Sequence, residues 1–371
     1  MIAQLKYTSI ITFISSISIL YAINNITDNL SNWECNPGHY KYELIDMDQN
    51  NRELDKVVIR AKIWKIHRAD SLFEMTENSI ENGFQNLINI YKESGILVNL
   101  TDVENIYNDS LYYFAYNGRP FDLMQSQSID SLINFYYLPN IDYTAGNLTG
   151  YGQAFNTPGN ELFIAGYECV DIGENIECYD LANTFIPIHE LGHCLGLFHT
   201  HVGTYGYEHV IRLDDEINDL CEVNCENSGD LLCDTEASVV LKNKVTYDEN
   251  NCSYISDEVD PCGYTYNPQI NNFMSYTHFE CAGSFTNQQI DKMFYSIEND
   301  NILSQVVISI GDLNDDLEIN VLDVLILVNT LLSNEDIPDL YLWLGDMNND
   351  TLIDITDVIL LINIILEENN Y

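Results

Sequence analysis

Positive charge is scarce in this chain. Only 14 of its 371 residues are Lys or Arg, against 58 Asp or Glu, and the formal net charge is −44. This balance argues against a nucleic-acid partner, because a phosphate backbone is held by Lys and Arg side chains. The acidity favours a solvated surface with carboxylates that can bind Ca²⁺, although adaptation to salt or solubility would also produce it.

Long apolar runs are missing after the first residues. The stretch from about Thr8 to Ala22 follows a single Lys and ends in a small residue, as a secretory signal peptide does, so we expect residues 1–22 to be removed. The stretch is short for a membrane span, which needs ~20 residues, and an uncleaved anchor is the alternative. The sequence therefore predicts a secreted or cell-surface protein without a membrane span once the signal is removed.

A linker rich in Pro or Gly is absent between the body of the chain and its tail, near residues 297–308. We expect an N-terminal extension or pro-segment at 23–55, a catalytic domain at 56–300 and a separate C-terminal domain at 308–371. The ten cysteines form an even set behind a signal peptide, which favours disulfides over free thiols. A structural zinc cluster at Cys221, Cys225 and Cys233 is the less favoured alternative.

The apolar pattern of the body predicts alternating strands and helices. Strand-type alternation occurs at 56–68, 97–108, 131–141 and 160–170. Helical spacing of apolar residues predicts helices at 76–96 and 182–200, the second of which should stop near Gly196. This order predicts an α/β (α+β) domain with a mixed, twisted sheet.

The sequence HELGHCLGLFHTH, at residues 189–201, carries the strongest chemical signal. Positions four apart lie on one face of a helix, so His189 and His193 can offer imidazoles to one metal ion. A turn with positive φ at Gly196 would bring His199 to the same ion. Three nitrogen ligands with an open position are typical of a catalytic zinc site, and Glu190 would then act as general base toward water.

A helix with incidental histidines is the alternative interpretation. The complete H-E-x-x-H-x-x-G-x-x-H spacing in a chain that looks secreted favours the metal site. His201 has no place in this spacing, and we interpret it as a surface residue or one just outside the ligands.

The extended motif resembles that of the metzincin zinc peptidases. The clan also has a tight turn with Met beneath the metal, and N-F-M-S-Y supplies Met274 followed by Tyr276. The resemblance implies that Tyr276 supports the tetrahedral intermediate. Within the clan, GDLLCDT at 229–235 and NFMSYTHFECAGSFTNQQIDKM at 272–293 resemble the pappalysin (cytophagalysin-like) family, although Glu236 replaces the family's usual Pro.

The pappalysin resemblance implies further contacts. It implies a disulfide between Cys233 and Cys281, and an acidic residue, Glu280, at the base of the pocket for the side chain after the scissile bond, where it would select Arg or Lys. The positions of the remaining cysteines predict a second bridge, from Cys221 or Cys225 to Cys252 or Cys262. They also predict a local loop closed by Cys169 and Cys178. Cys194 is either a buried free thiol or a disulfide partner. Cys35 is a latency thiolate or a disulfide partner.

The tail contains two copies of one motif at a period of 34 residues, GDLNDDLEINVLDVLILVNTLL at 311–332 and GDMNNDTLIDITDVILLINIIL at 345–366. Each offers oxygen ligands at the positions of an EF-hand-type loop, followed by an apolar helix. The predicted calcium ligands are Asp312, Asn314, Asp316, Asn320 and Asp323 in the first copy, and Asp346, Asn348, Asp350, Asp354 and Asp357 in the second. The pair resembles a dockerin, a small all-α calcium-binding module, which implies a cohesin-like partner.

Leu317 and Thr351 occupy the loop position where Gly is expected, which should strain both loops. A calcium-stiffened tail without a cohesin-like partner is the alternative, and a tail for surface attachment or sorting is another.

The sequence as a whole predicts a secreted zinc metalloendopeptidase that cleaves proteins or peptides and is anchored through its tail. A narrow processing peptidase with one protein substrate fits equally well. From a different class, the alternative is a non-catalytic, calcium-dependent attachment or scaffold protein with a structural zinc domain. The presence of Glu190 argues against that alternative, because zinc binding alone does not need this residue.

Overall fold

A computed structural model describes residues 39–40, 55–70, 77–112, 121–138, 151–165, 167–171, 176–201, 207–212, 221–248, 251–333 and 336–368. The predicted signal peptide, Cys35 and nearly all of the expected 23–55 extension lie outside these residues. Within the described ranges, no helix is long and apolar enough to cross a membrane.

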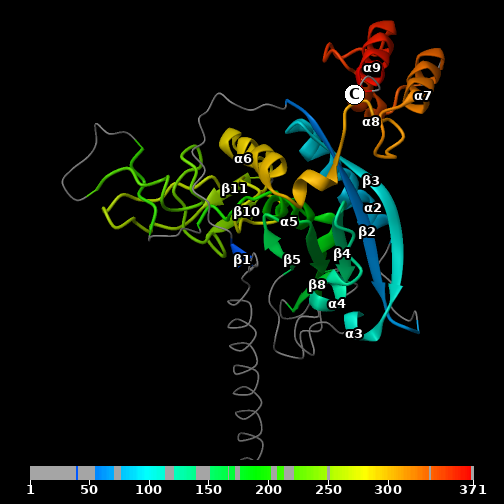
Figure 1. Cartoon of the computed structure of the whole chain (residues 1–371). Helices are drawn as coiled ribbons and strands as arrows, with labels where there is room; N and C mark the ends of the chain where they lie inside the picture. Colours follow the sequence, from blue (N-terminus) through cyan, green and yellow to red (C-terminus); the bar gives the residue numbers. More distant parts are fainter. Residues whose placement is uncertain are drawn as a thin grey trace, which may run out of the picture.

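A mixed sheet forms the centre of the molecule (Figure 1). Strand β2 (Val57–His67) pairs in parallel with β3 (Ile96–Tyr107) along one edge and with β4 (Ile133–Leu138) along the other. Strand β7 (Glu161–Ala165) continues in parallel, and β5 (Gly152–Ala154) pairs antiparallel with β7 at the edge of the sheet. The predicted mixed sheet is therefore confirmed.

The last strand predicted from the sequence, at 160–170, is two strands in the structure. Strand β8 (Tyr167–Asp171) follows β7 and forms an antiparallel pair with β9 (Ile176–Asp180). Cys169 and Cys178 are directly opposite in this register. Their side chains lie outside the described residues, so the predicted local pairing stays a prediction.

Residues of alternating orientation on the strands build two cores. Toward one face, Ile59, Ile63 and Phe135 pack with helices α2 (Glu77–Glu93) and α5 (Ile186–Cys194). On the opposite face lies a second cluster with the neighbouring short helices α3 (Asp109–Tyr112) and α4 (Phe121–Gln125). Its fully enclosed members are Trp64, Ile66, Leu111, Met124, Tyr136, Leu138, Phe155 and Phe163. Helix α5 therefore lies against the sheet, on the side of α2.

A lobe of few regular elements continues from the sheet. It contains the hairpin of β10 (Val245–Asp248) and β11 (Asn251–Tyr254) and ends in helix α6 (Asn287–Asn299). Thr286 caps α6 through a capping box with Gln289. Strand β6 (Asn156–Thr157) pairs in parallel with β1 (His39–Tyr40). A short 3₁₀ helix, η2 (Leu181–Asn183), precedes the metal-site helix.

The disulfides of this lobe correct one expectation. The predicted Cys233–Cys281 bond is wrong: Cys233 is bonded to Cys225, with Cα atoms 5.1 Å apart, and Cys281 to Cys252, with Cα atoms 5.9 Å apart. The turn at 225–233 brings Cys225 within bonding distance, while the β10–β11 hairpin packs Cys252 against Cys281. The predicted second bridge is confirmed as Cys221–Cys262.

The tail packs directly on the sheet. Its helices α7 (Val321–Leu332), α8 (Asp339–Gly345) and α9 (Ile355–Glu368) enclose a small core. This core also contains Val58 and Leu97 from β2 and β3, and Ile308 from β12 (Val307–Ile308), which pairs antiparallel with the start of β2. Figure 1 shows the three tail helices beside the ends of β2 and β3.

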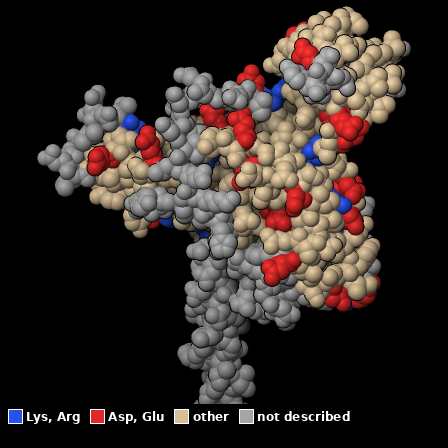
Figure 2. Space-filling model, viewed as in Figure 1, with Lys and Arg blue, Asp and Glu red and all other residues tan. Residues whose placement is uncertain are grey.

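Ion pairs add to this apolar contact. Arg60, on β2, pairs with Asp315 and donates to the backbone oxygen of Val307 at 2.8 Å. Lys56 lies 3.5 Å from Asp346, and Lys92 on α2 lies 2.6 Å from Asp339. Three of the chain's 14 basic residues therefore bind carboxylates of the tail, on a surface where Asp and Glu are widely scattered (Figure 2).

Candidate active site

Helix α5 carries the metal-site sequence and is shorter than the predicted 182–200. The 3₁₀ helix η2 precedes it, and Pro187 stands in its first turn, where the missing N–H costs nothing. The helix ends at Cys194, and Gly196 follows with a φ of +93°. The predicted turn at Gly196 is confirmed, and it reverses the chain toward His199.

The three predicted histidine ligands meet at one point. Their Nε2 atoms are 3.2 Å apart for His189 and His193, 2.9 Å for His193 and His199, and 3.1 Å for His189 and His199. Within the described residues, this is the only group of three or more His, Cys, Asp or Glu side chains whose donor atoms converge closely enough to hold a metal ion. Zinc binds nitrogen ligands at about 2.0–2.1 Å, so three nitrogens this close together can share one ion after only a small outward shift.

Hydrogen bonds on the far side of the rings fix which nitrogen faces the centre. Nδ1 of His189 donates to the backbone oxygen of Phe273 at 2.7 Å, and Nδ1 of His193 donates to that of Leu197 at 2.7 Å. Neutral rings that donate from Nδ1 present lone pairs at Nε2. Converging lone pairs repel one another unless a cation lies between them, so the donor set fits zinc.

Burial keeps these imidazoles in the ligating form. His189, His193 and His199 are at most 2% exposed. Loss of solvation lowers the pKa of His189 to about 4, and lowers the pKa of His193 and of His199 well below the usual value. All three rings are therefore neutral at pH 7, as metal ligands must be.

Glu190 lies between the helix and the edge strand of the sheet. Its side chain is 1% exposed, and its Oε2 accepts the backbone N–H of Ala154 at 2.9 Å. Gly152 on β5 makes this approach possible, because a Cβ there would lie 2.7 Å from Cγ of Glu190. The carboxylate is thus held beside the histidines by the strand opposite.

Met274 and Tyr276 both lie close to the histidine-bearing segment. Met274 is fully buried under α5, and a Cβ on Gly192 would lie 2.6 Å from its Sδ. The ring of Tyr276 lies 4.6 Å from that of His199, and the ring of His201 stacks on His199 at 5.0 Å with an angle of 3°. His201 is therefore not a free surface residue but packs on the third ligand.

The other two residues singled out in this region have different environments. Glu280 is exposed, and its backbone N–H donates to Nδ1 of His278 at 3.3 Å. Cys194 is buried and is a free thiol, as one of the two sequence interpretations had it. Burial raises the pKa of this thiol well above its ordinary value, so it stays protonated.

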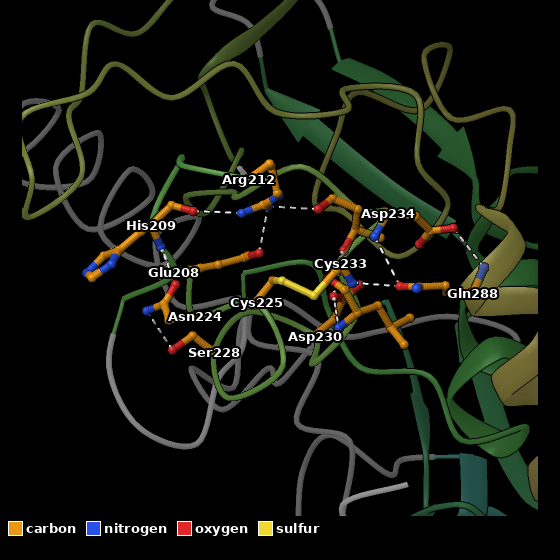
Figure 3. The surroundings of a disulfide bond; sticks show 12 residues. Glu208, His209, Arg212, Asn224, Cys225, Ser228, Asp230, Cys233, Asp234 and Gln288 are labelled. Atoms are coloured by element: carbon orange, nitrogen blue, oxygen red, sulfur yellow. Dashed lines mark hydrogen bonds and ion pairs between the residues drawn. A yellow bond between two sulfur atoms is a disulfide. The ribbon is translucent and has the colours of Figure 1, made fainter. Parts of the chain in front are cut away.

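The Cys225–Cys233 disulfide is joined to α6 by a hydrogen-bonded contact that the sequence did not predict (Figure 3). Oε1 of Gln288 accepts the N–H of Cys233 at 2.6 Å, and Asp234 accepts the N–H of Gln288 at 2.8 Å. Arg212 joins Glu208, at 2.7 Å, to the backbone oxygen of Thr235, at 2.9 Å. These contacts fix the loop that precedes the Met-containing turn.

The calcium ligands predicted for the tail stay a prediction. Asp312 accepts the N–H of Asp316 at 3.2 Å and of Leu317 at 3.0 Å, and Asp346 repeats this pattern in the second copy. Both carboxylates are nearly fully buried, at 1% and 3% exposure. Leu317 and Thr351 have φ values of +70° and +71°, so the backbone strain expected at these positions is present.

Parts of this chain are similar to known proteins. No family model matches the chain. Human and mouse pappalysin-1 are each 34% identical over 116 residues, which is 30% of this chain and 6% of the relative, so the chain corresponds to a small part of these relatives. Mature mirolysin of Tannerella forsythia, solved with a cleaved peptide, is 15% identical over 69% of this chain and 97% of its own, with a TM-score of 0.40, too loose an overlap to assign the fold.

Proposed function

We propose that this chain is a zinc metalloendopeptidase of the pappalysin-like metzincin type, secreted or held at the cell surface. The observation that carries the proposal is the convergence of three buried imidazole nitrogens with Glu190 beside them. The disulfides support an oxidising, extracellular location. Protein or peptide substrates follow from the same chemistry, and mirolysin was solved with a cleaved peptide.

Each side chain has a role in peptide hydrolysis. His189, His193 and His199 would hold the ion, and zinc when bound supplies Lewis-acid activation of water and of the scissile carbonyl. Glu190 takes a proton from the attacking water and delivers it to the leaving amine. The Tyr276 hydroxyl donates to the oxygen that develops negative charge. Phe273 and Leu197 hold two of the imidazoles in the required orientation through their carbonyl oxygens.

The Glu190→Gln variant tests this proposal. The carboxamide has nearly the same shape but cannot take up a proton, so we expect kcat/KM on a quenched-peptide library to fall at least a thousand-fold while one zinc per chain is retained. Removal of zinc with phenanthroline should abolish cleavage, and added zinc should restore it.

A non-catalytic attachment protein with a structural zinc domain predicts the opposite result. The unmodified chain would then bind one zinc, measured by elemental analysis, but would cleave no peptide of the library, and Glu190→Gln would change nothing.

For the tail we propose a second function, calcium binding by a dockerin-like module. Support comes from the two equivalent loops, in which buried Asp312 and Asp346 each collect two backbone N–H groups, and from burial that raises the pKa of Asp312, a penalty that a bound cation would offset. Apolar side chains at equivalent places on α7 and α9 are exposed, which favours a cohesin-like partner: Val321, Leu325 and Leu332, and Ile355, Ile359 and Leu366. Calorimetric titration of the full chain with Ca²⁺ should show two sites per molecule.

A further inference from the structure

A small cavity lies directly beside the catalytic residues. Its lining consists of His189 and Glu190 together with Tyr151, Gly152, Phe185, Ile186, Tyr276 and Thr277. Its water-accessible volume is only about 10 Å³. One water molecule needs roughly 10–15 Å³ by this measure, so the cavity has room for little more than a methyl-sized group.

Aromatic side chains account for the small size of the cavity. Tyr151, beside the edge strand β5, and Phe185, at the start of α5, both line the cavity and are each at most 8% exposed. Phe279 lies against both, with its ring 5.8 Å from that of Tyr151 and 6.0 Å from that of Phe185. Phe279 does not itself line the cavity, but its ring packs on both of these lining side chains.

Among the described lining residues, the polar groups are few and uncharged apart from the catalytic carboxylate. Thr277 contributes a buried hydroxyl, whose Oγ1 has no hydrogen-bond partner among the described residues. Glu280 is one residue beyond Phe279 but is exposed to solvent and is not part of the lining. Apart from Glu190, the described lining offers no carboxylate to a guanidinium or ammonium group that entered the cavity, and a buried unpaired charge is costly.

The position of Glu190 decides which substrate side chain the cavity receives. Under the proposed peptidase function, on which this inference rests, Glu190 delivers a proton to the leaving amine. That amine belongs to the residue that follows the scissile bond. Its side chain is therefore the one closest to a cavity that Glu190 lines.

We propose that Phe279 is a positioning residue for specificity: by packing on Tyr151 and Phe185 it holds both lining side chains in place, so that the residue after the scissile bond must have a small, uncharged side chain. Ala and Ser fit the available space, and the Ser hydroxyl can bond to Thr277 Oγ1. Large apolar and basic side chains do not fit while Phe279 holds Tyr151 and Phe185 in these positions. Glu280 has no part in selecting the side chain.

The test is mass-spectrometric mapping of cleavage sites, with kcat/KM for a peptide series that differs only in the residue after the scissile bond. In the unmodified full chain, we expect Ala and Ser peptides to exceed Leu, Phe and Arg peptides at least ten-fold. Phe279→Ala should raise kcat/KM for the Leu peptide at least ten-fold relative to the Ala peptide, because one extra methylene alone can be worth 10–200-fold in a fitted pocket. Phe279→Leu should give an intermediate ratio.

Two further variants make the comparison specific. Phe285→Ala removes an aromatic ring of the same lobe that contacts Tyr91 and Phe273, in tilted arrangements, instead of the cavity wall, and it should leave the Leu-to-Ala ratio unchanged. Glu280→Gln should not alter the ranking of side chains. Thermal unfolding and zinc content of each variant report whether it is folded.

The outcomes separate this inference from the proposed function. Preferential cleavage before Arg or Lys that Glu280→Gln abolishes would overturn the role of Phe279 while leaving the zinc peptidase intact. An unchanged ranking in both folded Phe279 variants would also overturn it. A zinc-loaded chain that cleaves nothing would refute the peptidase function and this inference together.

Discussion

Individual residues of the metal site were readable from the sequence, because the ligand spacing is set by helix geometry alone. His189 and His193 lie one turn apart, and the positive φ of Gly196 was predictable from the residue type. The groups that orient these ligands could not be predicted from the sequence. The oxygen of Phe273, which fixes His189, is 84 residues away in the sequence, and a backbone acceptor leaves no signal in its side chain.

The close approach of Gly192 and Met274 predicts how a methyl group added at position 192 would change stability. An Ala at 192 would place its Cβ 2.6 Å from the Met274 Sδ, in a site where Met274 has no exposed surface. Overpacking of this kind typically costs about 1–3 kcal/mol. We expect Gly192→Ala to lower the free energy of unfolding by that amount, measured by chemical denaturation of the zinc-loaded chain.

Gly283→Ala is the matched control. It lies in the segment after Met274, and an added Cβ there meets no atom within 4 Å. Its stability should equal that of the unmodified chain or slightly exceed it. Equal losses in the two variants would show that the Met274 contact is not the cause.

At the scale of elements, the strands were predicted better than the connections between them. The predicted strand at 56–68 corresponds to β2 (Val57–His67), because its β-branched residues are buried on both faces. The helix predicted from residue 182 begins later, at Ile186, because a 3₁₀ helix and Thr184 precede Pro187, whereas its predicted end near Gly196 is confirmed. The Cys233–Cys281 pairing failed because it rested on a resemblance, and spacing alone cannot fix pairing among several cysteines.

The backbone of the second tail loop is strained at one residue. Thr351 is β-branched and has a φ of +71°, a conformation that costs a non-Gly residue of order 1–3 kcal/mol. Replacing Thr351 with Gly removes this strain, but part of the gain in stability is offset because Gly has greater conformational entropy in the unfolded chain. We therefore expect Thr351→Gly to stabilise the tail by about 1 kcal/mol and to tighten calcium binding, measured by calorimetric titration.

Leu352→Gly provides the comparison for this loop. Leu352 is exposed and has an ordinary, negative φ, so Gly there removes no strain and should destabilise the chain slightly. The same sign of change in both variants would contradict the assignment of strain to Thr351.

At the scale of the whole molecule, the described part of the tail packs on the central sheet. The separate domain expected at 308–371 stays a prediction, and the core of the tail includes Val58 and Leu97 of that sheet. The missing Pro- or Gly-rich linker near 297–308 was the one sequence feature consistent with this arrangement. Contacts such as Arg60 with Asp315 could not be predicted, because 255 residues separate the partners.

This continuity predicts a single unfolding transition. Leu344 is fully buried in the core shared by the tail and the sheet, and loss of such a side chain typically costs about 2–5 kcal/mol. We expect Leu344→Ala to lower the temperature of one common transition, followed by calorimetry and by zinc release. The control is Leu322→Ala, at a tail position with 50% exposure.

Two resolved transitions, with Leu344→Ala shifting only the one that leaves zinc in place, would show that the tail unfolds independently. The tail would then be a tethered module, as its sequence had suggested.

The docking of the tail on β2 also has a consequence for the order in which the chain matures. Strand β2 and the preceding Lys56 are made early. The partner of Arg60, Val307, follows 247 residues later, and the partner of Lys56, Asp346, follows 290 residues later. At a synthesis rate of roughly 5–20 residues per second, β2 waits about 15–60 s for the segment that covers it. A prematurely terminated chain would carry the complete zinc site on a sheet whose apolar patch stays open. A chain without residues 308–371 would therefore expose Val58 and Leu97, which the tail covers in the full chain.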